Sequence, residues 1–202
     1  MDPQSVMLLG GGASLPETVA ALPSMPAISM NGHGYGLYPV TAMVFADKPW
    51  QLSASGVANA MLSPAVRVYA PSSRMTERIQ PGDTRKLRDC PNVHAYDVMM
   101  RGADPAKFFQ EHADWGDWPT LDDPGARSVL LVALRLAYDL GYRTVYLAGC
   151  DFDPPSEHFQ RLTEQLERIH PVLREHGMTV WNLNHTSRLM VFPMVRPDEV
   201  LV

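Results

Sequence analysis

Short apolar segments alternate with helix-forming segments along this 202-residue chain. The apolar segments end in turns rich in Gly, Asn and Asp, which is typical of buried strands. Nearly continuous apolar strands separated by helices predict a parallel sheet that is covered on both sides. We therefore expect an α/β fold, with a mainly parallel sheet and helices on both faces. A chain of this length suits a single domain over residues 1–202.

The expected elements follow from apolar spacing and from turn residues. The expected strands cover residues 6–9, 27–30, 42–46, 65–70, 93–98, 144–148 and 178–183. The expected helices cover about 15–22, 55–61, 128–140 and 156–176. Residues 101–126 carry prolines, tryptophans and many aspartates, which predicts a long loop that forms part of a site.

Composition narrows the classes of function. A net charge of −5 gives no indication of non-specific nucleic-acid binding, and the densest basic run, Arg85 to Arg88, is expected to be a solvated turn. Cys90 and Cys150 form no disulfide framework, as is usual in a reducing compartment. The chain has no long apolar run and no secretion signal, so we expect a cytoplasmic protein without a membrane span. Homo-oligomerisation is left open.

The first expected strand runs into Gly10, Gly11 and Gly12, followed by Ala13 and Ser14; we call residues 10–14 the glycine loop. Glycines let a backbone approach a ligand closely. Ser14 is expected to cap the next helix, whose unpaired N–H groups favour an anion. The spacing is neither that of a dinucleotide-binding fingerprint nor that of a Walker loop. Two interpretations stand: a phosphate-binding loop, or a turn without a ligand.

Polar residues follow three further expected strands. Asn31, Asp47 and Asp151 stand at or just beyond these strand ends. The carboxyl ends of parallel strands meet at one edge of a sheet, and ligands of such folds bind there. The sequence therefore predicts a ligand site at the edge that these residues share with the glycine loop.

Histidines and carboxylates near this edge are the candidates for chemistry. His158, at the start of the last long helix, is expected to take a proton from an acceptor hydroxyl, and Asp151 is the second catalytic candidate. His185 and His33 are alternatives for the base. Carboxylates also bind Mg²⁺, so Asp47 and Asp151, with Asp153 nearby, are the metal candidates. No zinc motif is present.

Three blocks of the sequence resemble one enzyme superfamily. They are Val6 to Leu15 with Ser29–Asn31 and Val44–Asp47, then Gly125 to Phe152, and finally Trp181 to Leu189 with Phe192 and Pro193. In this order they resemble the bacterial lipooligosaccharide sialyltransferases, and equally the related superfamily that includes the archaeal 6-hydroxymethylpterin diphosphokinases. The resemblance spans nearly the whole chain in short blocks.

This resemblance implies a Rossmann-like nucleotide-binding domain. It implies that a cytidine nucleotide-sugar is held by the glycine loop and Asn31. It also implies that phosphate is held at the start of the long helix, either at Ser128 or at the turn with Gly125. The full set of nucleotide-binding candidates is Gly10, Gly11, Gly12, Ser14, Asn31, Asp47, Ser128, Asn184 and Ser187. Two features depart from the family: Gly11 and Ala13 replace its Asn and Pro, and the insertion with the sialyltransferases' catalytic His and Tyr is missing.

The function that these observations favour is transfer from a nucleotide-activated donor. We expect a glycosyltransferase that moves a sugar from a nucleotide-sugar to a hydroxyl acceptor, with His158 as the base and without a tightly bound cofactor. One alternative is an Mg²⁺-dependent pyrophosphokinase of the 6-hydroxymethylpterin diphosphokinase type, which would use Asp47 and Asp151. The other is a nucleotide-binding protein without catalysis.

Overall fold

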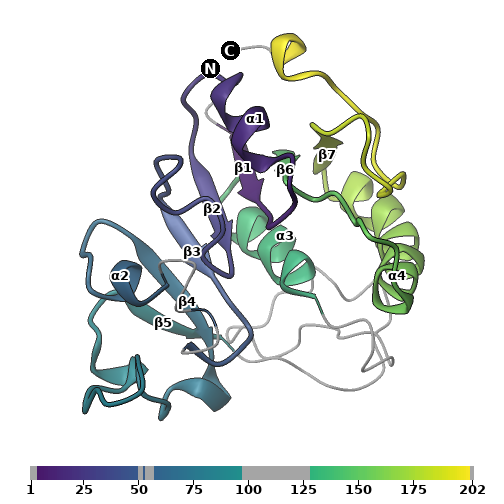
Figure 1. Cartoon of the computed structure of the whole chain (residues 1–202). Helices are drawn as coiled ribbons and strands as arrows, with labels where there is room; N and C mark the ends of the chain where they lie inside the picture. Colours follow the sequence, from purple (N-terminus) through teal and green to yellow (C-terminus); the bar gives the residue numbers. More distant parts are fainter. Residues whose placement is uncertain (1–3, 50–51, 53–56, 97–127, 201–202) are drawn as a thin grey trace.

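The computed structural model describes residues 4–49, 52, 57–96 and 128–200, and its strands form one parallel sheet (Figure 1). The sheet order is β5-β4-β3-β2-β1-β6-β7. The strands are β1 Ser5–Leu9, β2 Ala27–Met30, β3 Ala42–Val44, β4 Arg67–Pro71, β5 Val93–Tyr96, β6 Thr144–Ala148 and β7 Thr179–Asn182. The expected α/β fold is confirmed. The loop expected over 101–126 lies outside the described residues.

Helices cover both faces of this sheet. They are α1 Leu15–Ala20, α2 Val57–Met61, α3 Val129–Asp139 and α4 Glu157–Glu175. Alternate strand residues point to opposite faces: Val6 and Leu8 pack in one core with α3 and α4, whereas Met7 and Leu9 pack in another with α1. A third core packs α2 against β3 and β4, on the same face of the sheet as α1. Short 3₁₀ turns cover Ser72–Arg74, Leu87–Asp89 and Pro197–Glu199.

Local sequence signals fix the ends of the two long helices. The Ser128 side chain accepts a hydrogen bond from the Leu130 N–H at 3.1 Å, and Ser156 accepts one from the Phe159 N–H at 3.2 Å. Gly141 and Gly177, just past the helix ends, have φ values of 90° and 73°, a conformation that favours glycine. The expected bounds of α3 and α4 are therefore confirmed to within a residue or two.

The order of the strands determines where a ligand can enter. From β1 the chain adds β2, β3, β4 and β5 in one direction, and then returns to place β6 and β7 on the other side of β1. The direction of winding thus changes between β1 and β6. In open parallel sheets the loops at such a point separate and leave a crevice for a ligand. Within the described part of the chain, no helix combines the length and apolar character needed to cross a membrane.

Candidate functional site

A cavity of about 290 Å³ lies at this change of direction; we call it the first cavity. It is formed by the loops that follow β1, β2 and β6, together with the first turns of α3 and α4. The predicted site residues that line it are Gly10, Gly11, Gly12, Asn31, Ser128 and Asp151, and His33, Phe152, Asp153 and Phe159 line it as well. The structure therefore brings together a large part of the predicted nucleotide site.

The three glycines of the glycine loop are explained by close contacts within the protein. A Cβ at Gly10 would stand 2.4 Å from the carbonyl oxygen of Gly149, and one at Gly11 would stand 2.6 Å from the His33 ring. A Cβ at Gly12 would stand 2.4 Å from the Asp151 carboxylate. The glycines were expected to let a ligand approach closely; the groups that approach them closely in the structure belong to the protein.

Three backbone N–H groups of the glycine loop, those of Gly10, Gly12 and Ser14, already have partners inside the protein. The N–H groups of Gly10 and Gly12 donate to the carbonyls of Ala148 and Gly149, both at 2.7 Å. By contrast, the N–H groups of Gly11 and Ala13 make no hydrogen bond with any residue that the structure describes. Both residues are exposed. They are the donors that this loop offers to an anion.

Asp151 ties the glycine loop to the segment after β7. Its carboxylate accepts hydrogen bonds from the Ser14 N–H at 2.9 Å, the Ser14 hydroxyl at 2.5 Å and the Asn184 side-chain amide at 2.8 Å. The prediction that the Ser14 side chain caps α1 is therefore wrong. The hydroxyl donates to a carboxylate, which is a stronger partner than the backbone N–H that a cap would satisfy.

Asn184 and Ser187 support the loop after β6 and do not line the first cavity. The Asn184 amide oxygen accepts hydrogen bonds from the N–H and the hydroxyl of Thr186, at 3.0 and 2.8 Å. The Ser187 hydroxyl donates to the Cys150 carbonyl at 2.7 Å and accepts from the Leu189 N–H at 3.0 Å. Both residues are buried, so their polar groups are occupied in holding the site together.

Asn31 lines the first cavity and carries an unsatisfied acceptor. Its backbone has a φ of 53°, and its N–H donates to the Val44 carbonyl at 2.8 Å. Its side-chain oxygen Oδ1 is buried and has no hydrogen-bond partner among the described residues. A buried polar atom without a partner costs about 1–3 kcal/mol, and native structures contain few of them. A small rotation of the Asn31 side chain would bring this acceptor to a ligand in the first cavity.

His33 is the histidine that the structure places in the first cavity. Its N–H donates to the Met30 carbonyl at 3.0 Å, and its carbonyl accepts from the Ser29 hydroxyl at 2.6 Å, so the turn that carries it is well fixed. Burial lowers the pKa of His33, which favours the neutral ring. The signal in the sequence was its place, two residues after Asn31 and between two glycines.

The other candidates lie outside the first cavity. His158 is exposed on the first turn of α4, with its ring centroid 5.7 Å from that of Phe159, and His185 is exposed after β7. Asp47 is exposed beyond β3, and β2 and β1 lie between β3 and β6. Strands about 4.8 Å apart separate the ends of β3 and β6 by about 14 Å, so Asp47 and Asp151 do not form one metal site. Among the residues described, no group of three or more His, Cys, Asp or Glu is arranged to hold a metal ion.

Comparison with known proteins supports the fold. By sequence, the chain matches no family model and no curated protein. In structure it is similar to the MAf glycosyltransferase from Magnetospirillum magneticum AMB-1, with a TM-score of 0.61, and to a mutant of the α-2,3/8-sialyltransferase CstII, with a TM-score of 0.53. Both are 13% identical to this chain.

The two similarities differ in how much of the other protein they cover. Each includes 98% of this chain, which corresponds to 34% of the MAf chain and 89% of the CstII chain. The chain thus spans about a third of the MAf glycosyltransferase. At this identity the likeness establishes the fold: an α/β sheet of the kind found in glycosyltransferases. Neither similar protein is a pterin diphosphokinase.

Proposed function

We propose that this protein is a glycosyltransferase that binds a nucleotide-activated sugar in the first cavity. The observation that carries the proposal is the buried, unpaired Oδ1 of Asn31, a residue that lines a cavity at the point where ligands bind in this class of sheet. The fold similarity to two glycosyltransferases supports the same class of reaction.

The donor is held through backbone and amide groups. Oδ1 of Asn31 accepts a hydrogen bond from the nucleoside, and the phosphate lies near the Gly11 N–H and the N-terminus of α3, whose N-cap is Ser128. No Lys or Arg is among the described residues that line the first cavity, whereas Asp151 and Asp153 are. Mg²⁺ bound to the nucleotide would offset these carboxylates, so binding is to be measured with and without it.

His33, rather than His158, is the base in this proposal, because it lines the first cavity and has a lowered pKa. In the transfer step, the acceptor oxygen forms a bond to the anomeric carbon while its proton moves to the His33 ring. The bond between the anomeric carbon and the phosphate oxygen breaks, and its electron pair leaves with the nucleotide. Asp151 acts as a positioning residue, because its carboxylate holds Ser14 and Asn184.

The proposal is tested by calorimetric titration of cytidine and uridine nucleotides and nucleotide-sugars. The variant is Asn31→Gly, which removes the amide and tolerates the φ of 53° at this position. The loss of a buried hydrogen bond should weaken nucleotide binding by at least about tenfold. His185→Gly, at an exposed position outside the first cavity, is the matched control. Equal affinity of the wild type and Asn31→Gly, or no binding of any nucleotide by the wild type, would contradict the proposal.

A further inference from the structure

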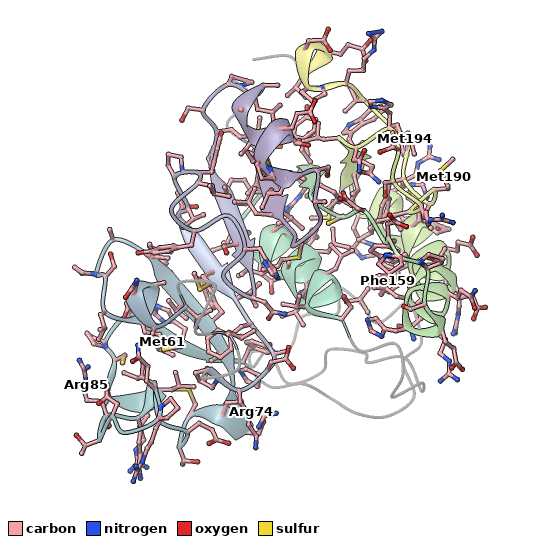
Figure 2. The ribbon with its side chains drawn as sticks, viewed as in Figure 1. Met61, Arg74, Arg85, Phe159, Met190 and Met194 are labelled. Carbon is pink, nitrogen blue, oxygen red and sulfur yellow. The ribbon has the colours of Figure 1, made fainter. Side chains whose placement is uncertain are left out.

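A second cavity, of about 370 Å³, adjoins the first. It is formed by the loop after β6, the first two turns of α4 and Arg188, and Phe152 and Phe159 line both cavities. Phe159, which belongs to the first turn of α4, is labelled in Figure 2. The two phenylalanine rings stack, with centroids 4.6 Å apart and an angle of 14° between their planes. The stacked pair is therefore the wall that the two cavities share.

The backbone at this wall is strained. Phe152 has a φ of 56°, which is rare for a bulky residue and costs about 1–3 kcal/mol. Hydrogen bonds hold the strained segment: the Arg188 N–H donates to the Asp151 carbonyl at 2.9 Å, and the Ser187 hydroxyl donates to the carbonyls of Cys150 and Asp151, at 2.7 and 3.2 Å. Strain that the surrounding structure maintains is concentrated at functional sites. Here the strained residue is one of the two whose rings line both cavities.

An ion pair connects the two cavities beside the wall. Arg188 lines the second cavity, Asp153 lines the first, and the Arg188 Nε lies 3.2 Å from an Asp153 carboxylate oxygen. Both side chains are more than half exposed, at 60% and 65%, so the pair contributes little to stability. The pair holds the Arg188 guanidinium at the rim of the second cavity.

We propose that the second cavity binds the acceptor of the transfer reaction, and that this acceptor is a pyranose sugar. The cavity combines an apolar floor of Phe152, Pro155 and Phe159 with polar groups at Gln160 and Arg188. A pyranose has the matching chemistry: an apolar C–H face that packs on aromatic rings, and hydroxyls around its edge that accept and donate hydrogen bonds. The Ser156 and Thr163 hydroxyls, which already bond to the α4 backbone, complete the lining.

This inference rests on the proposed function, since an acceptor site requires a donor site next to it. A sugar on the Phe152–Phe159 wall lies beside the first cavity. One of its hydroxyls reaches over the wall toward the anomeric carbon of the donor, and its proton passes to His33 as the new bond forms. Placing both substrates in neighbouring cavities contributes to the rate by proximity and orientation.

The test is an NMR titration of the protein with methyl pyranosides of glucose, galactose, mannose and N-acetylglucosamine, followed by a nucleotide. Gln160→Trp fills the second cavity from an exposed helix position. Its matched control is Glu167→Trp, which is exposed on the same face of α4 two turns further on and does not line the cavity. Arg188→Met removes the guanidinium, and exposed Arg168 of α4, as Arg168→Met, is its control.

We expect at least one pyranoside to shift the signals of Gln160 and Thr163 in the wild type and in both controls. Gln160→Trp and Arg188→Met should raise its Kd by at least about tenfold, while the nucleotide Kd changes by less than about twofold. Pyranoside binding that is unchanged in both variants, or absent up to the solubility limit of every sugar, overturns the inference. Nucleotide binding that persists then leaves the proposed function intact. Sugar binding in a chain that binds no nucleotide overturns both the acceptor role and the proposed function.

Discussion

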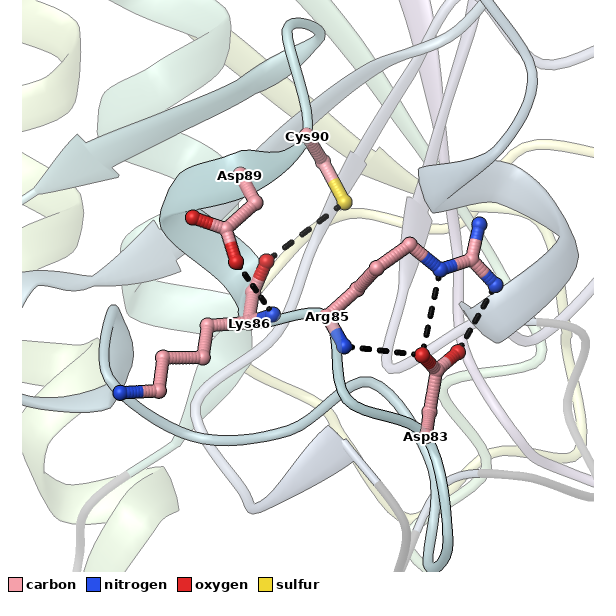
Figure 3. A network of polar contacts seen from close by, with 5 residues as sticks. All are labelled: Asp83, Arg85, Lys86, Asp89 and Cys90. Carbon is pink, nitrogen blue, oxygen red and sulfur yellow. Dashed lines mark hydrogen bonds and ion pairs between the residues drawn. The ribbon is translucent and has the colours of Figure 1, made fainter.

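Two polar networks of this protein use similar residues for different purposes. At the first cavity, Asp151 joins Ser14, which is 137 residues away in the sequence, to Asn184, which is 33 residues away. In the turn over residues 83–90, Asp83 pairs with Arg85 and Asp89 accepts from the Lys86 N–H, over separations of two and three residues (Figure 3). Figure 3 also shows the Cys90 thiol donating to the Lys86 carbonyl, four residues away.

The two networks differ in how far apart in the sequence their members lie. In the turn over 83–90 the charged side chains pair with groups two or three residues away, and Arg85 and Arg88 are exposed, as expected for this basic run. The Asp151 network joins three segments that meet only in the folded chain, beside an unpaired Asn31 oxygen. Losing a contact in the first network should therefore disturb the site, whereas losing one in the second should be nearly silent.

The largest expected effect concerns the histidine inside the first cavity. His33→Ala should lower the kcat of sugar transfer by about 10²–10⁴-fold, because a general base contributes that much. The nucleotide Kd should change little, since the phosphate is held by backbone groups. His158→Ala and His185→Ala, at exposed positions outside the cavity, are the controls in the same steady-state assay. If His158→Ala loses activity while His33→Ala keeps full activity, then His158 of α4 is the base and His33 is not.

The next effect compares the two networks directly. Asp151→Ala leaves the Ser14 hydroxyl and N–H and the Asn184 amide without their acceptor, so it should lower the free energy of unfolding by about 3 kcal/mol. Asp83→Ala removes an exposed pair and should leave the urea midpoint almost unchanged. The urea unfolding curves of the two variants are compared at pH 7. If Asp151→Ala and Asp83→Ala lose the same free energy of unfolding, the two networks contribute equally to stability, which contradicts this prediction.

A smaller effect tests the packing of the glycine loop. Gly12→Ala places a Cβ within 2.4 Å of the Asp151 carboxylate, which three hydrogen bonds keep from moving away. We expect a loss of about 2 kcal/mol in the free energy of unfolding, as for overpacking in a core. Ala13→Val, at the exposed neighbouring position, is the control. If Gly12→Ala is as stable as the wild type by thermal melting, the loop is less tightly packed than described.

The smallest effect is on the pH dependence of stability. Because burial lowers the pKa of His33 below its ordinary value of 6.5, the unfolded state binds protons first as the pH falls. The free energy of unfolding should therefore decrease as the pH drops from about 6.5 to the folded pKa of His33, and this contribution should then level off. His33→Gln should reduce the decrease, whereas His185→Gln should not. A decrease that is identical in both variants would assign it to other groups, among them His170, whose pKa burial also lowers.

Much of the fold follows from local signals that the sequence displays directly. The β2 strand over Ala27–Met30 and the β6 strand over Thr144–Ala148 match their expected ranges, because an apolar run between turn residues has few other structures open to it. Ser128 caps α3 as its position suggests. The meeting of the glycine loop, Asn31 and Asp151 was also predictable, because parallel strands end at one edge.

The parts that were not predictable depend on the directions of side chains and on distant partners. His158 is close to Asp151 in sequence, yet it is His33 that lines the first cavity, because the turn after β2 places its ring against Gly11. Ser14 has the sequence position of a helix cap, but its hydroxyl meets a carboxylate 137 residues away. No local pattern encodes that contact. Asp47 fails as a metal partner of Asp151 for a topological reason: two strands separate β3 from β6.

A crystal structure with an unreactive nucleotide-sugar analogue is the decisive measurement for the proposal that the first cavity binds a nucleotide-activated sugar. We expect the nucleoside within hydrogen-bonding distance of Oδ1 of Asn31, and the phosphate at the Gly11 N–H and the start of α3. We also expect the sugar to point toward Phe152 and Phe159. An analogue bound elsewhere on the protein, with Oδ1 of Asn31 still unpaired, would show that the first cavity is not the donor site.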